Sequence, residues 1–144
     1  MLTNLLINKL KNSPNARIVN ISSMAHIRGE INFEDINLDK NYDRYDAYSQ
    51  SKLANILFNR ELALRLSDTN VKTYCLHPGL INTDLYRHLH SMLSCLFNIF
   101  HSLVNISPEL GAQTTIYCTL EPSIGEETGH YYKFVFDFDF KYIF

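Results

Sequence analysis

The chain has 144 residues, of which 46% are hydrophobic and 19% charged, and its formal net charge is −2. This length suits one domain, and this hydrophobic content is too high for an intrinsically disordered chain. Because there is no surplus of lysine and arginine to neutralise phosphates, nucleic acid is not expected as a partner.

The first part of the chain predicts a helix, a strand and a connection. Residues 2–11 carry leucines at helical spacing, and this helix should end before Pro14. Residues 16–22 form an apolar, β-branched run typical of a buried strand, and Ser23 follows it. Residues 24–44 are rich in acids and asparagines, so we expect them to form a polar connection.

A long helix is predicted over residues 45–67, followed by a strand over residues 71–76 and a Pro78-Gly79 break. The apolar residues at helical spacing should face the sheet, and they are Leu53, Ala54, Ile56, Leu57, Ala63 and Leu64. Strand, helix and strand in this order are typical of a parallel sheet with crossover helices, so the fold class is α/β.

The last part of the chain predicts another helix and a final strand. The helix covers residues 107–120, because Ser107-Pro108-Glu109 combines a capping serine, a first-turn proline and an acid. The strand spans about 130–140, where alternate positions are apolar, namely Phe134, Phe136, Phe138 and Phe140.

Tyr48 and Lys52 are the pair most suggestive of chemistry. Side chains four residues apart lie on one helical face, and a cation beside a phenol favours the phenolate, which suits proton transfer. A solvent-facing tyrosine and lysine would show the same spacing, so the surroundings decide. Ser23 and Pro78-Gly79 both follow strands, and ligands of open α/β sheets bind at the carboxyl ends of the strands.

These segments together resemble the short-chain dehydrogenase/reductase family, and within it the retinol dehydrogenase-type members. The resemblance rests on the segments 17–26, 47–55, 60–66, 76–79 and 111–114, in this order and spacing. It implies a Rossmann-type doubly wound parallel sheet, of which this chain should hold the C-terminal half, with about three strands and their flanking helices.

The resemblance also implies a role for each matching residue. Tyr48 matches the general acid/base, and Lys52 matches the residue that assists the tyrosine and holds the nicotinamide ribose. Ser23 matches the residue that hydrogen-bonds the substrate oxygen. Pro78 and Gly79, with Ile81 and Thr83 after them, resemble the segment that packs on the nicotinamide and bonds its carboxamide. The implied activity is NAD(P)-dependent interconversion of an alcohol and a carbonyl on an apolar substrate, with NADP favoured by the resemblance.

The family's Gly-rich cofactor turn is missing from this sequence. The five glycines stand at positions 29, 79, 111, 125 and 129, too far apart for such a turn. We therefore expect residues 1–144 to form a single partial domain that lacks the N-terminal, Gly-rich cofactor-binding half. An alternative follows, in which the chain is an inactive remnant that acts, if at all, through a partner.

Residues 84–106 are apolar but interrupted by histidines, and the uninterrupted stretch is too short to span a bilayer. In the family this region is a substrate flap, and residues 85–104 could also touch a membrane surface. The alternative is an ordinary amphipathic helix that covers the core. The expected setting is intracellular, either cytoplasmic or associated with the endoplasmic-reticulum or mitochondrial membrane.

Two other kinds of site find little support. His88, His90, Cys95 and His101 lack a familiar zinc spacing, so no metal is expected. A hydrolase triad around Ser23 is not expected, because the sequence has no G-x-S-x-G elbow. His26 is then a loop residue and His77 a packed residue before the turn. The three cysteines are widely spaced and are expected to be reduced.

Overall fold

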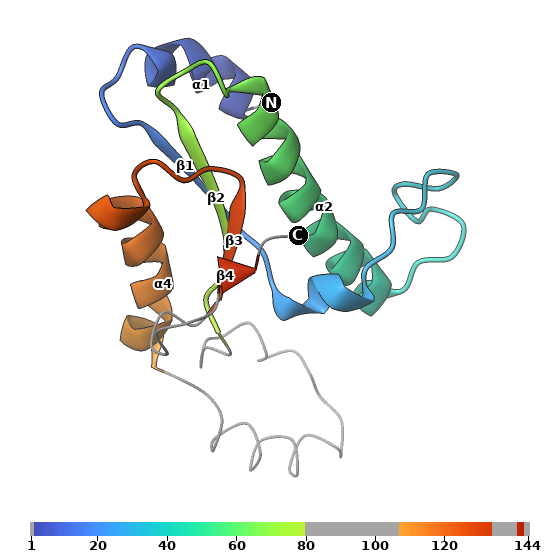
Figure 1. Cartoon of the computed structure of the whole chain (residues 1–144). Coiled ribbons are helices and arrows are strands. Elements are labelled where there is room, and N and C mark those ends of the chain that lie inside the picture. The colour runs from blue at the N-terminus through green and yellow to red at the C-terminus, as the bar shows by residue number, and fades with distance from the viewer. Residues whose placement is uncertain (1, 80–106, 134–140, 143–144) are drawn as a thin grey trace.

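The structure is a computed structural model, and it describes residues 2–79, 107–133 and 141–142 (Figure 1). The first half of the chain contains α1 (Leu2–Lys11), β1 (Arg17–Ile21), the 3₁₀-helix η1 (Met24–Arg28) and α2 (Arg44–Arg65). The second half contains β2 (Lys72–His77), α4 (Pro108–Leu120), the 3₁₀-helix η3 (Pro122–Ile124), β3 (His130–Lys133) and β4 (Lys141–Tyr142). The predicted helices and the first two strands are confirmed to within one or two residues.

The strands form one sheet in the order β1-β2-β3-β4. β1, β2 and β3 are parallel, with Ile21 opposite Leu76 and His77 opposite Lys133. The prediction of an α/β fold with about three parallel strands is therefore confirmed. Of the final strand predicted over about 130–140, the structure describes β3 over residues 130–133, and β4 pairs with β3 in the antiparallel direction. The phenylalanines at 134, 136, 138 and 140 lie outside the described residues.

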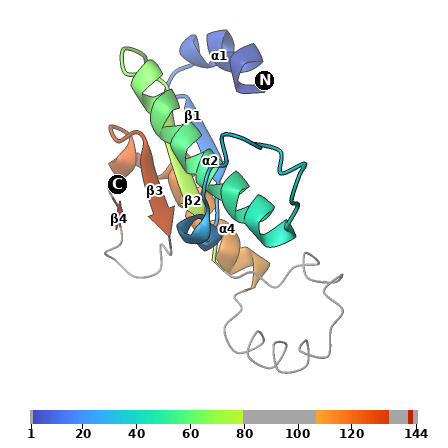
Figure 2. The ribbon, with the colours of Figure 1, turned by 90° about the vertical axis from the view of Figure 1, so that its right-hand side faces the viewer.

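Helices cover both faces of the sheet: α2 lies on one face and α4 on the other (Figures 1 and 2). β2 is buried from both sides, and its side chains alternate between the two helices. Thr73 and Cys75 face α2, whereas Tyr74 and Leu76 pack with Cys118 of α4. A strand covered on both faces is expected to be apolar along its whole length. β2 is apolar only in its middle, at Tyr74, Cys75 and Leu76, and the buried polar side chains of Thr73 and His77 flank this stretch.

A second group of apolar side chains lies next to α1, at the amino-terminal ends of β1 and β2. Figure 1 shows this end of the sheet at the top. Ala16, Leu62, Leu66 and Val71 are buried there, and Ile7 and Leu10 of α1 pack against them. This cluster explains why the short helix α1 stays on the α2 side of the sheet, even though none of its own residues is fully buried.

The predicted sheet-facing side of α2 is partly wrong. Ile56 and Ala63 are buried, but Leu57 is 46% exposed and Leu64 71% exposed, and Ala54 is exposed as well. Ser49, Asn59 and Leu62 are the other buried residues of the helix. The buried face is therefore partly polar, and Asn59 accepts a hydrogen bond from Asn20 of β1 at 3.1 Å.

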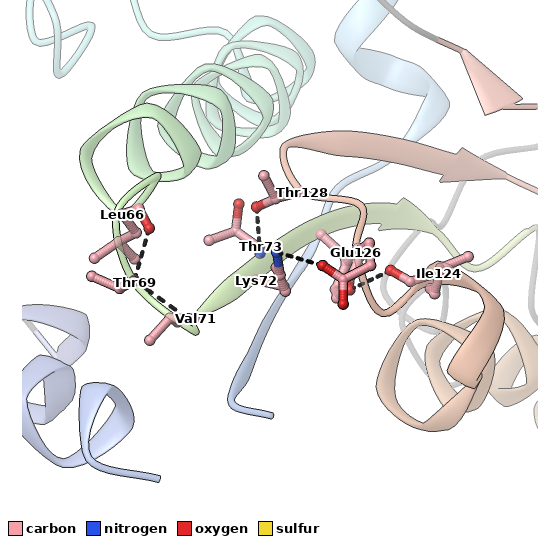
Figure 3. Close-up of polar contacts among 9 residues, drawn as sticks. Leu66, Thr69, Val71, Lys72, Thr73, Ile124, Glu126 and Thr128 are labelled. Atoms are coloured by element: carbon pink, nitrogen blue, oxygen red, sulfur yellow. Dashed lines mark hydrogen bonds and ion pairs between the residues drawn. The ribbon is translucent and has the colours of Figure 1, made fainter. Parts of the chain in front are cut away.

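Hydrogen bonds of threonines join the amino-terminal end of β2 to the end of α2 and to the turn before β3 (Figure 3). The Thr69 hydroxyl donates to the Leu66 carbonyl at the end of α2, at 2.7 Å, and accepts from the Val71 amide at 3.3 Å. The Thr73 amide donates to the Thr128 hydroxyl at 3.0 Å, which joins β2 to the turn before β3. These bonds lie at the end of the sheet opposite Ser23 and Gly79. They therefore stabilise the sheet without occupying the carboxyl ends of the strands, where the candidate site lies.

No helix within the described ranges is long and apolar enough to cross a membrane. Cys75 and Cys118 are free and buried, and burial raises the pKa of each thiol to about 12. Both are therefore protonated at neutral pH and pack as small apolar groups.

Candidate active site

The carboxyl ends of β1 and β2 meet at one edge of the sheet, as the sequence predicts. Ser22 and Ser23 follow β1, and the Ser22 amide donates to the Leu76 carbonyl at 2.7 Å. Pro78 and Gly79 follow β2, and Gly79 has a φ of 94°. Residues that carry a Cβ atom rarely adopt this φ angle, so a glycine is required at the turn.

Tyr48 and Lys52 lie in the first turns of α2. Asp43 caps this helix, because its carboxylate accepts from the amides of Tyr45 and Asp46 at 2.8 and 3.0 Å. The Lys52 Nζ atom lies 5.4 Å from the centroid of the Tyr48 ring. The structure thus brings this predicted pair together, and Tyr48 is 42% exposed and open to a ligand.

Three hydrogen bonds join the end of β1 to the same turns of α2. The Ser22 hydroxyl donates to the Lys52 carbonyl at 2.7 Å. The Ile21 carbonyl accepts from Lys52 Nζ at 3.4 Å and from Asn55 Nδ2 at 3.1 Å. Ser23, the next residue of the chain, is therefore held at the strand end that touches Lys52.

Ser23 also begins the 3₁₀-helix η1. Its backbone is extended, and its hydroxyl accepts from the Ala25 amide at 3.3 Å. η1 packs closely on α2 at Gly29, where an added Cβ would lie 2.5 Å from the Ser49 carbonyl oxygen. Ser49 follows Tyr48, so η1 connects the Ser23 end of the strand to the Tyr48 turn of the helix.

Sequence reasoning missed several of these supporting residues. His26 was expected in a loop, but it lies in η1 and is only 8% exposed. A serine that caps a short helical segment was a usable signal for η1. Asn55 and Ser22 were not singled out either. Asn55 lies three residues after Lys52, on the same helical face, and this spacing could have indicated it.

His77 adds no positive charge to this edge at neutral pH. The pKa of His77 is lowered to about 4, mainly by burial and to a smaller extent by electrostatic repulsion from Lys133 and His26. The expectation that His77 is a packed residue agrees with its 4% exposure. Lys52, by contrast, reaches the exposed phenol of Tyr48 and can present its ammonium to a ligand there.

Some predicted site residues lie outside the described residues. They are Ile81 and Thr83, the apolar segment 84–106, and the histidines and cysteine weighed as metal ligands, His88, His90, Cys95 and His101. Within the described part of the chain, no three histidine, cysteine or acidic side chains are grouped so that they could hold a metal ion.

The residues at the edge fit one end of a nicotinamide cofactor. The phenol of Tyr48 and the ammonium of Lys52 are neighbouring donors for ribose hydroxyls, and Gly79 offers backbone without a side chain. The sequence holds no Gly-rich turn for the pyrophosphate.

The family model for the short chain dehydrogenases matches residues 1–94. The chain therefore belongs to the short chain dehydrogenase family, as its motifs, its parallel sheet and the Tyr48–Lys52 pair indicate.

Within the family it is similar to the retinol dehydrogenases. It is 48% identical to retinol dehydrogenase 14 of Mus musculus over 134 residues, which are 92% of this chain and 40% of that protein. It is 46% identical to retinol dehydrogenase 12 of Homo sapiens over 133 residues, 92% of this chain and 42% of that protein. The chain thus spans about two fifths of the length of these relatives.

Solved structures share the fold. A protein from Mycobacterium paratuberculosis is 32% identical, with a TM-score of 0.65 over 92% of this chain and 41% of that one. The NADPH-bound carbonyl reductase from chicken fatty liver is 18% identical, with a TM-score of 0.61 over 92% of this chain and 48% of that one. The second likeness shows the fold alone.

Proposed function

We propose that Tyr48, Lys52 and Ser23 form the proton-transfer part of an oxidoreductase site that interconverts an alcohol and a carbonyl. The observation that carries the proposal is the placement of the Lys52 ammonium 5.4 Å from the Tyr48 ring, at the strand end that precedes Ser23. An exposed phenol, a fixed cation and a short hydroxyl at one edge can handle a proton on a substrate oxygen.

In the direction of reduction, the Tyr48 hydroxyl donates its proton to the carbonyl oxygen, while the carbon receives a hydride. A nicotinamide cofactor, when bound, supplies that hydride or accepts it in the reverse reaction. Ser23 donates a hydrogen bond to the substrate oxygen and holds it at the phenol. Lys52 keeps a positive charge beside the phenol while the proton leaves, and it binds the ribose hydroxyls. Oxidation of the alcohol follows the same steps in reverse.

For the substrate we propose an apolar alcohol or aldehyde, of the size of a retinoid. The similarity to the retinol dehydrogenases supports this class. The resemblance also favours NADP over NAD. The roles of Ile81 and Thr83 beside the nicotinamide, and contact of residues 85–104 with a membrane surface, remain part of the same proposal.

The second candidate is a catalytically inactive chain. In this alternative the chain keeps the fold and the Tyr48–Lys52 pair but does not bind the cofactor by itself. It would then act, if at all, as an interaction protein.

Cofactor binding separates the two functions. The purified chain is titrated with NADPH and with NADH while the fluorescence of the reduced nicotinamide is recorded, and retinal reduction is then assayed. Micromolar binding that weakens about tenfold in Lys52→Met supports the oxidoreductase.

Turnover that is lost in Tyr48→Phe and kept in Tyr45→Phe supports the proton-transfer role. Tyr45 is a matched control because it is also an exposed tyrosine at the start of α2. Absence of binding to either nucleotide would favour the interaction protein.

A further inference from the structure

We propose that His26 is a positioning residue, which fixes the main chain of Ser23 and so directs the Ser23 hydroxyl toward the substrate oxygen. This inference rests on the proposed function of Ser23. It assigns a role to a buried side chain that does not itself touch the substrate.

His26 contacts the carbonyl oxygen of Ser23 twice. Its Nδ1 atom lies 2.6 Å from this oxygen, and its main-chain amide donates to the same oxygen at 3.1 Å. A carbonyl oxygen can only accept, so the short contact requires a proton on Nδ1. Two donors on one carbonyl restrict rotation of the peptide group that follows Ser23.

The imidazole ring of His26 packs against a side chain of β3. Its ring meets the ring of Tyr131, in β3, edge to face, with centroids 5.0 Å apart and planes at 68°. Tyr131 is 3% exposed and His26 is 8% exposed, so both rings are packed in the interior. Packing of this kind leaves the imidazole little freedom to turn away from Ser23.

His26 also fixes the other end of its own turn. The Gly29 amide donates to the His26 carbonyl at 2.9 Å, and Gly29 packs directly on the Ser49 carbonyl. Ser49 is the residue after Tyr48. His26 therefore links the main chain of Ser23 to the helical turn that carries the acid/base.

A hydroxyl must be held within a few tenths of an ångström to orient a reacting oxygen, and small displacements lower rates by large factors. Loss of the Nδ1 donor should therefore lower kcat by about tenfold and leave KM for the nucleotide within about twofold, because Lys52 is not moved.

Two variants separate the donor from the ring. His26→Asn keeps an N–H at the position of Nδ1 and loses the ring, whereas His26→Phe keeps a ring against Tyr131 and loses the donor. Tyr131→Phe is the control, since the contact is between rings. Three measurements are made on the purified 144-residue chain: the ¹⁵N shifts of the His26 imidazole, the backbone shifts of Ser23, and the kinetics of retinal reduction.

We expect a protonated Nδ1 in the wild-type chain. The Ser23 shifts and kcat should change in His26→Phe, return toward wild type in His26→Asn, and stay unchanged in Tyr131→Phe. An unprotonated Nδ1, or Ser23 shifts that are the same in His26→Phe as in wild type, would overturn the proposal. If the wild-type chain shows no turnover, the proposed function fails, and the two spectroscopic measurements alone still decide the position of Ser23. If His26→Phe does not fold, the outcome is set by the protonation of Nδ1 in wild type and by the Ser23 shifts in His26→Asn.

Discussion

The hydroxyl of Ser22 donates a hydrogen bond to the main-chain carbonyl of Lys52 at 2.7 Å. Ser22 is only 2% exposed, and the bond joins the end of β1 to the first turns of α2, the helix that carries Tyr48. The position of the strand end relative to the helix therefore depends on a buried contact between a side chain and a main-chain atom. Such contacts are more specific in direction than apolar packing.

Replacement of Ser22 by alanine should lower the free energy of unfolding by about 1–2 kcal/mol, because a buried hydrogen bond is lost and nothing replaces it. Ser51→Ala is the matched control. The Ser51 hydroxyl also donates to a helical carbonyl, that of Tyr48 at 2.7 Å, but the contact is local and exposed. Urea unfolding should place the control within about 0.5 kcal/mol of wild type. Equal losses in the two variants would contradict a special role for the buried bond.

Arg17 should contribute to stability through its planar guanidinium. The side chain donates to the Cys118 carbonyl at 3.1 Å and to the Glu121 carbonyl at 2.8 Å, at the end of α4, and lies over the Tyr74 ring. Lysine keeps the charge but cannot serve both carbonyls, so Arg17→Lys should cost about 1–3 kcal/mol.

The comparison for Arg17 is Arg65→Gln, measured in the same denaturant series. Arg65 forms an exposed ion pair with Glu61 at 2.7 Å, and such pairs contribute little. The loss in Arg17→Lys should therefore clearly exceed the loss in Arg65→Gln. The reverse order would show that charge, and not the forked geometry, is what Arg17 supplies.

Gly29→Ala should destabilise the chain by about 1–3 kcal/mol, as overpacking at a backbone contact does. The new methyl group would lie 2.5 Å from the Ser49 oxygen and 3.0 Å from the Leu53 Cβ atom, so η1 must move away from α2. In Gly125→Ala the nearest atom is 3.0 Å away, which a small shift can relieve. The melting temperature of Gly29→Ala should be lower than that of Gly125→Ala. A melting temperature of Gly29→Ala equal to that of wild type would disprove the tight contact.

The pH dependence of stability should show the effect of His77. Its pKa is about 4 in the folded chain, mainly because the side chain is buried, whereas an unfolded histidine titrates near 6.5. Between these values the unfolded state binds more protons. Stability is therefore fully present above pH 6.5 and falls as the pH drops toward 4, by roughly 2–3 kcal/mol. His77→Gln, which cannot titrate, should flatten this part of the curve, and an unchanged slope would assign the loss to other groups.

The hydrophobic pattern and local signals predicted most of the fold, because the run that forms β1 is apolar and β-branched, Pro78-Gly79 marks the end of β2, and Ser107 before Pro108 marks the start of α4. The hydrophobic pattern failed on the buried face of α2. Leu57 and Leu64 were expected inside, but Asn59 takes an interior position and is 0% exposed. Asn59 can be buried because it accepts a hydrogen bond from Asn20, and hydrophobic periodicity cannot reveal such a tertiary contact.

The Tyr48–Lys52 pair could be predicted from spacing, since a helix fixes neighbours at i and i+4. The parts of the site that depend on distant segments could not. The ring contact of His26 with Tyr131 joins residues from opposite ends of the chain, and the approach of Gly29 to Ser49 depends on how a long connection folds back. The antiparallel pairing of β4 with β3 was not predicted either, because an alternating apolar run does not indicate which strand it will pair with.

The two borders of the sheet differ in length and direction. Among the described strands, β1 pairs only with β2, so one border offers a five-residue parallel strand, whereas at the other border the structure describes two residues, those of β4. If two molecules meet through β1 about a twofold axis, β1 of each molecule is paired and is no longer available to a further partner. Association through β1 should therefore stop at pairs, and turbidity should rise far less steeply with concentration than it does for an open-ended assembly.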